Sequence, residues 1–272
     1  MQEAQDFKAE CDAVAKIIAD LPASAFDTRT QFMDWTIGDV VGHLYLWNLA
    51  AGLTLQSRSA FKTFIDYILA NYGDGGSSLE VQYKYIDAFL GGARGKALFD
   101  LWYEDYPRLA AKFEAADPDQ RVAWAGPNMS ARSKIIARQM ETWAHGQELF
   151  DVLGLEPTHA DRIKNIAHLG VTTYGWTFRN RETEPPQPKP YVRLTAPSGT
   201  IWGWNEVQEG NRVEGDAVEF CQVVTQTRSI TDTRLKVVGT PALAWMAIAQ
   251  CFAGGPKDPP AKGQRHKAAN PL

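Results

Sequence analysis

The sequence predicts a mainly α-helical bundle in its N-terminal part and a small α+β domain after it. Apolar residues recur at helical spacing over most of residues 3–181. A proline-rich stretch at 183–190 ends this pattern, and short runs rich in β-branched and aromatic residues follow it. We therefore expect a helical bundle at 1–182, a linker at 183–190, a small α+β domain at 191–255 and a disordered tail at 256–272.

The first two helices have clear start and stop signals. Apolar residues form one stripe over residues 3–21, and Pro22 ends it. Thr36 and Asp39 then resemble a capping box in which Asp takes the usual place of Glu. This box opens an apolar run that reaches about Leu55, which predicts a second helix.

Glycines divide the next part of the bundle. We expect a helix at 60–71, an exposed glycine- and serine-rich loop at 73–78, and helical structure from 78 to 116 with Ser78 as its N-cap. Gly91, Gly92 and Gly95 interrupt this last segment and predict a kink or a break between two helices.

The remaining elements follow from turn residues and a change of period. A turn at 125–127 precedes a strong helix at 130–154 with Gly154 as its C-cap, and a last bundle helix is expected at 160–181. Beyond the linker, residues 191–206 predict a hairpin. We also expect a helix at 216–227, a strand at 234–238 and a helix at 241–252.

Composition excludes several classes of partner. The formal charge of −4 and the pI near 5.8 give no basic face for nucleic acid. No run of about 18 apolar residues exists, so we expect no membrane span. The three cysteines form no CxxC pair, which favours a reducing, cytoplasmic location. We expect a small-molecule substrate, and a monomer or a homodimer.

Glu141 and His145 suggest a metal site. They are four residues apart on a predicted helix, so both side chains leave the same face one turn apart. A third ligand from another helix would complete a site with an open position, as in catalytic zinc centres. His43 is the leading candidate because it lies in an apolar helical stretch, where an unpaired imidazole would be costly.

Simpler interpretations exist for each of these residues. A lone histidine in an apolar stretch is more often a satisfied core residue, and a Glu–His pair at this spacing is more often an exposed helix pair. Glu148 could replace Glu141 as the carboxylate ligand, and Asp39 is interpreted as the cap partner of Thr36. His168 could line the same cavity, although a core role is the more common one.

Two motifs resemble a known family. Residues 35–44 (WTIGDVVGHL) and 138–145 (RQMETWAH) look like the N-terminal domain of mycothiol-dependent maleylpyruvate isomerases, which belong to the DinB-like metal-binding four-helix bundles. In that superfamily a histidine of the second helix joins two ligands one turn apart on a later helix. The resemblance, which spans about residues 5–180, implies that His43, Glu141 and His145 bind a divalent transition metal.

The C-terminal half resembles a domain of the same isomerases. Residues 215–221 and 235–239 look like their small sterol-carrier-like domain, and residues 245–254 are similar to an uncharacterised branch of the superfamily. In the isomerases an arginine of this domain contributes to the thiol-cofactor site. Arg228 follows the matching helix and is the candidate here.

These observations leave three functions open. The leading hypothesis is a metal-dependent enzyme that uses a low-molecular-weight thiol such as mycothiol, as an isomerase or S-transferase, with His168 and Arg228 as catalytic residues. A hydrolase with metal-bound hydroxide, and His168 or Glu148 as proton carrier, is a second. A non-catalytic metal-binding module that holds an apolar ligand is a third. Zinc is the expected metal, with nickel, cobalt or iron as alternatives.

Overall fold

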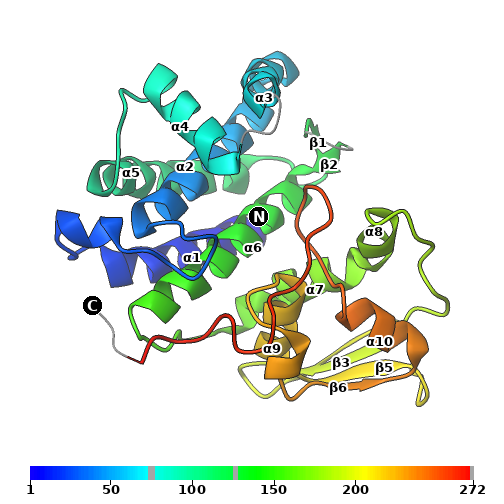
Figure 1. The fold of residues 1–272 in the computed structure, drawn as a ribbon. Coiled ribbons are helices and arrows are strands. Elements are labelled where there is room, and N and C mark those ends of the chain that lie inside the picture. The colour runs from blue at the N-terminus through cyan, green and yellow to red at the C-terminus, as the bar shows by residue number, and fades with distance from the viewer. Residues whose placement is uncertain (73–76, 125–127, 270–272) are drawn as a thin grey trace. The chain divides into compact units, whose positions relative to one another are not determined.

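The structure is a computed structural model that describes residues 1–72, 77–124 and 128–269. The chain forms two compact units, Met1–Leu149 and Phe150–Pro271 (Figure 1). The first is helical and the second is mixed α+β, which confirms the predicted fold class. Residues 73–76 of the expected loop at 73–78 lie outside the described residues, and so does the whole expected turn at 125–127.

The first unit is built from six long helices and a short hairpin in its described part. Short 3-10 turns aside, the elements are α1 (Gln2–Ile18), α2 (Ile37–Gln56), α3 (Arg58–Tyr72), α4 (Ser78–Phe89), α5 (Lys96–Ala115), β1 (Arg121–Val122), β2 (Met129–Ser130) and α6 (Ala131–Val152), which continues into the second unit.

Capping residues set the helix starts. Thr36 and Asp39 form the expected capping box at the start of α2, each side chain accepting from the other's backbone N–H. At α4 the prediction was wrong by one residue, because Ser77 and not Ser78 is the N-cap. Ser77 pairs with Glu80 in a second capping box, a signal that the sequence carried.

Glycines end two helices of the bundle. Gly91, Gly92 and Gly95 have positive φ, so the expected break after α4 is real and separates α4 from α5. Gly154 also has a positive φ, and its N–H donates to the carbonyl of Asp151 after the last turn of α6.

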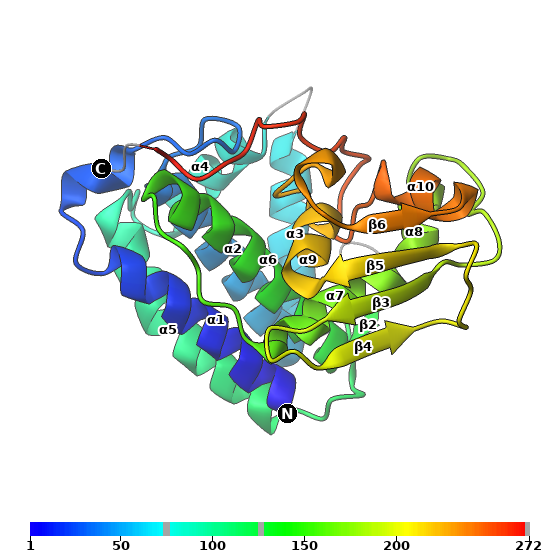
Figure 2. The same ribbon diagram turned by 90° about the horizontal axis from the view of Figure 1, so that it is seen from below.

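Close packing holds α6 against α1 and α2. The buried guanidinium of Arg138 donates to Asn48 Oδ1 at 3.0 Å and to the carbonyl of Leu44 at 3.1 Å. The hydroxyl of Thr142 lies 3.8 Å from the buried thiol of Cys11. Helix α5 packs against both α1 and α2, as Figure 2 shows for α1. These contacts fix the faces of α2 and α6 that turn toward each other.

The second unit combines short helices with a four-stranded sheet. Its helices are α7 (Lys164–Thr172), α8 (Tyr174–Arg179), α9 (Ala217–Val224) and α10 (Thr240–Met246), and its strands are β3 (Tyr191–Thr195), β4 (Ile201–Trp204), β5 (Arg212–Asp216) and β6 (Lys236–Val238). The strand order is β4-β3-β5-β6, with β3 and β5 parallel and the other pairs antiparallel (Figure 2).

Several boundaries in this unit differ from the sequence-based expectation. The expected hairpin at 191–206 is confirmed as β3 and β4. The expected helix at 160–181 is divided at Thr173, whose hydroxyl donates to carbonyls of α7. Strand β5 was missed, since three of its five residues are charged and one is Gly215. Helix α10 ends at Met246, short of the expected residue 252.

The predicted linker and tail have defined contacts. Residues 183–190 lie inside the second unit, and the boundary between the two compact units falls within α6. The domain limits expected from the sequence stay a prediction. In the tail, Gly263 N donates to Asp232 and Ala268 N to the carbonyl of Asp151. Polar contacts therefore anchor a segment for which the sequence offered no apolar anchor. No helix in the described ranges is both long and apolar enough to cross a membrane.

Candidate metal centre

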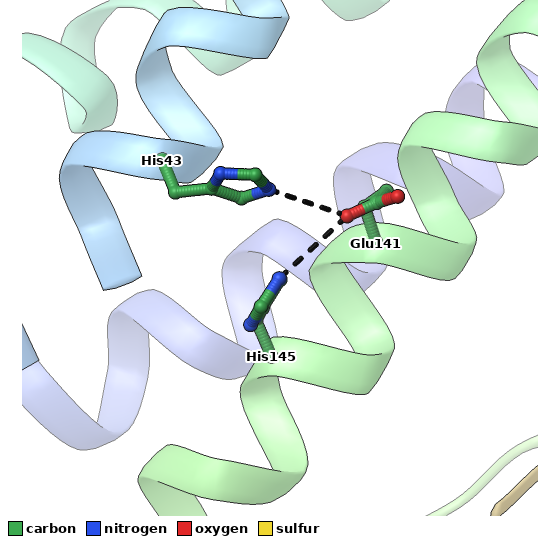
Figure 3. A group of neighbouring side chains, drawn as sticks. All are labelled: His43, Glu141 and His145. Carbon is green, nitrogen blue, oxygen red and sulfur yellow. Dashed lines mark hydrogen bonds and ion pairs between the residues drawn. The ribbon is translucent and has the colours of Figure 1, made fainter. Parts of the chain in front are cut away.

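Three side chains converge between α2 and α6 of the first unit. His43 Nε2 lies 3.4 Å from Glu141 Oε2, and His145 Nε2 lies 3.6 Å from the same oxygen. Figure 3 shows the imidazole of α2 and that of α6 directed at one carboxylate oxygen. One ligand atom from each residue lies within 4.8 Å of the others. No other such group of His, Cys, Asp or Glu occurs in the part of the chain that is described.

These distances fit a metal better than a hydrogen-bond network. Ligands about 2.0–2.1 Å from one tetrahedral ion lie about 3.3 Å from each other. The two N–O separations, 3.4 and 3.6 Å, are close to this value and longer than a good N–H···O hydrogen bond of about 2.9 Å. Two imidazoles and one carboxylate are a common donor set for zinc, and they leave a fourth position open.

Aromatic rings fix the two imidazoles. The indole of Trp35 lies 5.5 Å from the His43 ring and is stacked 6.3 Å from the His145 ring, centroid to centroid. Phe32 meets His145 edge-on at 5.0 Å, and Trp47, one turn after His43, lies 6.3 Å from that ring. These rings form an aromatic wall that restricts the orientations of both imidazoles.

Positive charge surrounds the carboxylate. Burial would raise the pKa of Glu141, but the hydrogen bond and charge of His43, with the charges of His145 and Arg138, lower it to about 2. Glu141 is therefore ionised across the physiological range, as a metal ligand must be. Arg138 is held in place by Asn48 and Leu44 and supplies this charge from one turn away.

The other candidate residues lie elsewhere. Glu148 is buried on α6 and is not one of the three clustered ligands, and Asp39 is the cap partner of Thr36 as expected. His168 belongs to the second unit, where its Nδ1 accepts from Trp204 Nε1 at 3.2 Å. Arg228, also of that unit, donates two hydrogen bonds to the carboxylate of Asp151, at 2.7 and 2.8 Å.

Sequence reasoning missed the aromatic wall around the imidazoles. A partial signal existed, because Trp47 follows His43 by four residues and so shares its face of α2. The positions of Phe32 and Trp35 depend on the loop before α2, where Met33 and Asp34 have positive φ. Asp tolerates that conformation better than most residues, but Met does not favour it, so the local sequence does not predict two such residues in a row.

Comparison with known proteins identifies the family. Residues 7–150 match the family described as "Mycothiol maleylpyruvate isomerase N-terminal domain". The chain belongs to this family. The match covers α2 and α6 and so contains all three clustered residues. An uncharacterised protein of Mycobacterium tuberculosis, found in strains CDC 1551 and H37Rv, is 34% identical over 260 residues, which is 95% of this chain and 96% of the relative.

Solved structures share the fold of the family. The crystal structure of the mycothiol-dependent maleylpyruvate isomerase and that of a histidine-to-alanine mutant each align with a TM-score of 0.50 at 15% identity. Each alignment covers 82% of this chain and 87% of the other. At this identity the likeness establishes the fold, and it extends beyond the residues of the N-terminal family domain.

Proposed function

We propose that the protein is a metal-dependent enzyme that uses a low-molecular-weight thiol such as mycothiol, as an isomerase or S-transferase acting on a small-molecule substrate. The observation that carries this proposal is the convergence of His43, Glu141 and His145 from two helices of the family domain. The names of the structural neighbours, mycothiol-dependent maleylpyruvate isomerases, support the thiol and the reaction class. Zinc is the proposed native metal, with nickel, cobalt or iron as alternatives.

The three residues would hold the metal, and the surrounding residues would keep them in place. A divalent metal bound there supplies a positive charge that keeps a thiol in its thiolate form at neutral pH. Glu141 is already ionised, and Arg138 compensates its charge from one turn away. Phe32 and Trp35 keep both imidazoles oriented, so little reorganisation accompanies binding.

Two residues of the second unit complete the proposal. Arg228 is proposed to bind the thiol cosubstrate, which requires it to exchange part of its ion pair with Asp151. His168 is proposed to carry a proton, since an imidazole has both a donor and an acceptor nitrogen. Its Nδ1 accepts from Trp204 Nε1, so the neutral ring holds its hydrogen on Nε2, and proton uptake requires Nδ1 to exchange this contact for the incoming proton. The sterol-carrier-like character of this unit is part of the same proposal.

Cobalt substitution tests the proposal. Addition of mycothiol to the cobalt-loaded protein should produce a sulfur-to-metal charge-transfer band, because thiolate is a much better electron donor than water. Glu141→Gln should alter this response, because loss of the carboxylate charge changes how well the protein retains cobalt and changes the ligand field of the cobalt that remains. Arg228→Ala should weaken the apparent thiol affinity while the cobalt content stays unchanged, and Arg234→Ala, an exposed arginine of the same unit, is the matched control.

One result would reject the thiol. If mycothiol, glutathione and bacillithiol all leave the cobalt spectrum unchanged while the metal is bound, the thiol part of the proposal is wrong. The assignment of His43, Glu141 and His145 as metal ligands would not be affected by this result. A hydrolase that uses the same three ligands would then be the function to assay.

A further inference from the structure

A cavity lies in the first unit, and its lining does not include the three clustered residues His43, Glu141 and His145. It has a volume of about 680 Å³ and is lined by the C-terminal halves of α2 and α5, with Tyr85 of α4 and Gln120. Its volume falls within the range of small-molecule sites, about 300–1,000 Å³.

Two buried polar atoms of this lining have no hydrogen-bond partner among the described residues: Asn48 Nδ2 and Asp105 Oδ2. Asn48 is 0% exposed, and its Oδ1 already accepts from Arg138 Nε at 3.0 Å. This contact fixes the amide orientation, so Nδ2 must find an acceptor elsewhere. Buried polar groups are nearly always paired in folded proteins, so an unpaired donor and an unpaired acceptor in one cavity point to a ligand.

The glycines of α2 explain where the space lies. A Cβ added at Gly38 would lie 2.9 Å from Gly95 Cα, and one added at Gly42 would lie 2.8 Å from Gln82 Nε2, so α2 is closely packed there. At Gly52 the nearest atom to an added Cβ is Leu109 Cδ1, at an ordinary 3.5 Å. Gly52 and Leu109 both line the cavity, which therefore has room for a larger side chain at position 52.

The lining argues for an uncharged ligand. Leu49, Leu53 and Leu109 offer an apolar surface. Burial raises the pKa of Asp105, while the charges of Lys112 and Arg108 lower it. An anionic ligand would add a second negative charge beside this carboxyl group, and a cation would meet Lys112, which also lines the cavity. A hydroxyl group both accepts and donates, so it suits Asn48 Nδ2 and Asp105 Oδ2 together.

We propose that the cavity between α2 and α5 is a binding site for an uncharged, hydroxyl-bearing small molecule with an apolar frame. Its hydroxyl oxygen accepts from Asn48 Nδ2, and a hydroxyl proton is donated to Asp105 Oδ2. The apolar frame packs against Leu53 and Leu109. The site is separate from the metal centre and does not depend on the proposed thiol chemistry.

Methyl NMR with a matched pair of probes tests this site. Cyclohexanol and cyclohexyl methyl ether share a ring, but the ether cannot donate a hydrogen bond. We expect cyclohexanol to shift the leucine methyl signals of the cavity in a saturable way, in metal-free and metal-loaded protein alike. The ether should bind about tenfold more weakly, since it leaves the carboxyl group without a donor.

Variants separate this site from adventitious binding. Asp105→Ala should remove the difference between alcohol and ether, and Asp66→Ala, an acid on the exposed face of α3, should leave it unchanged. Gly52→Leu should fill the cavity and abolish the shifts. Equal affinities for alcohol and ether in the wild-type protein, or no saturable shift with cyclohexanol, would overturn the proposal and leave a cavity that holds only water.

Discussion

Two carboxylates of α6 are bound by basic side chains in different ways. Asp151 receives the guanidinium of Arg228 through both oxygens, at 2.7 and 2.8 Å. Glu141 receives two imidazoles at a single oxygen, at the longer distances of 3.4 and 3.6 Å. The first arrangement is a closed ion pair, because each carboxylate oxygen faces one guanidinium donor. The second leaves room for a positive ion between the groups.

The difference separates a pair that is complete without a further ligand from a group that has room for one. In the Arg228–Asp151 pair both partners are already satisfied, so a ligand of Arg228 has to displace part of this contact. His43, Glu141 and His145 lie beside the aromatic wall, and their ligand atoms are at separations that suit one bound metal ion. Perturbing each region in turn should therefore affect different properties of the protein.

Removal of a ligand should have the largest effect. His43→Ala and His145→Ala each leave two ligands, and we expect metal affinity to fall by at least about 100-fold. Competition with a chromophoric chelator measures this affinity. His168→Ala, which removes a histidine outside the cluster, is the control and should retain the metal. Wild-type metal affinity in both variants would show that neither histidine is a metal ligand.

Breaking the closed pair should affect stability and leave metal binding intact. Arg228→Ala strands the carboxylate of Asp151, whose side chain is 11% exposed, and should lower the free energy of unfolding by about 2 kcal/mol. Urea denaturation measures this loss. The control Arg234→Ala removes an arginine whose side chain is 92% exposed and should change stability by less than about 0.5 kcal/mol. Loss of metal from Arg228→Ala would contradict the expectation that this ion pair affects stability without affecting metal binding.

The aromatic wall should contribute a smaller, indirect effect. Trp35→Leu keeps an apolar side chain and removes the surface that contacts both imidazole rings. We expect metal affinity to fall about tenfold, as for other groups that orient ligands. Trp204→Leu, which removes the donor to His168 in the second unit, serves as the matched control. Unchanged affinity in Trp35→Leu would show that the helices alone position the imidazoles.

The smallest effect concerns pH. The folded-state pKa of Glu141, about 2, lies below the ordinary value of 4.5, so its ionised form stabilises the metal-free protein above about pH 4.5. That contribution is lost as the pH falls through about 2. The stability advantage of the wild type over Glu141→Gln should therefore be about 1 kcal/mol near pH 5 and should vanish toward pH 2. A difference independent of pH would contradict this electrostatic account.

Much of the fold was predictable because its signals are local. The capping box of Thr36, the glycine break before α5 and the positive φ of Gly154 are all set by neighbouring residues. Strand β5 was not predictable in this way. Its residues gain their place from pairing with β3 and β6, which are distant in sequence, and not from their own propensities.

The residues of the candidate site also divide into those that local patterns predict and those that depend on tertiary packing. Glu141 and His145 share a helix face by spacing alone, whereas His43 of α2 was a candidate from its apolar stretch, and the resemblance of two short motifs supported its place beside them. The wall of Phe32 and Trp35 and the ion pair of Arg228 with Asp151 depend on loop conformation and tertiary packing. No periodicity in the sequence encodes such contacts.

X-ray absorption spectroscopy at the metal edge of the purified protein tests the central claim most directly. We expect about one metal ion per chain, with nitrogen and oxygen neighbours at about 2.0–2.1 Å and the multiple scattering of two imidazoles. In His145→Ala, any metal that remains should retain the scattering of a single imidazole. A sulfur neighbour at about 2.3 Å in thiol-free protein would assign the metal to Cys11, Cys221 or Cys251 and contradict the account. A protein that binds no transition metal would contradict it equally.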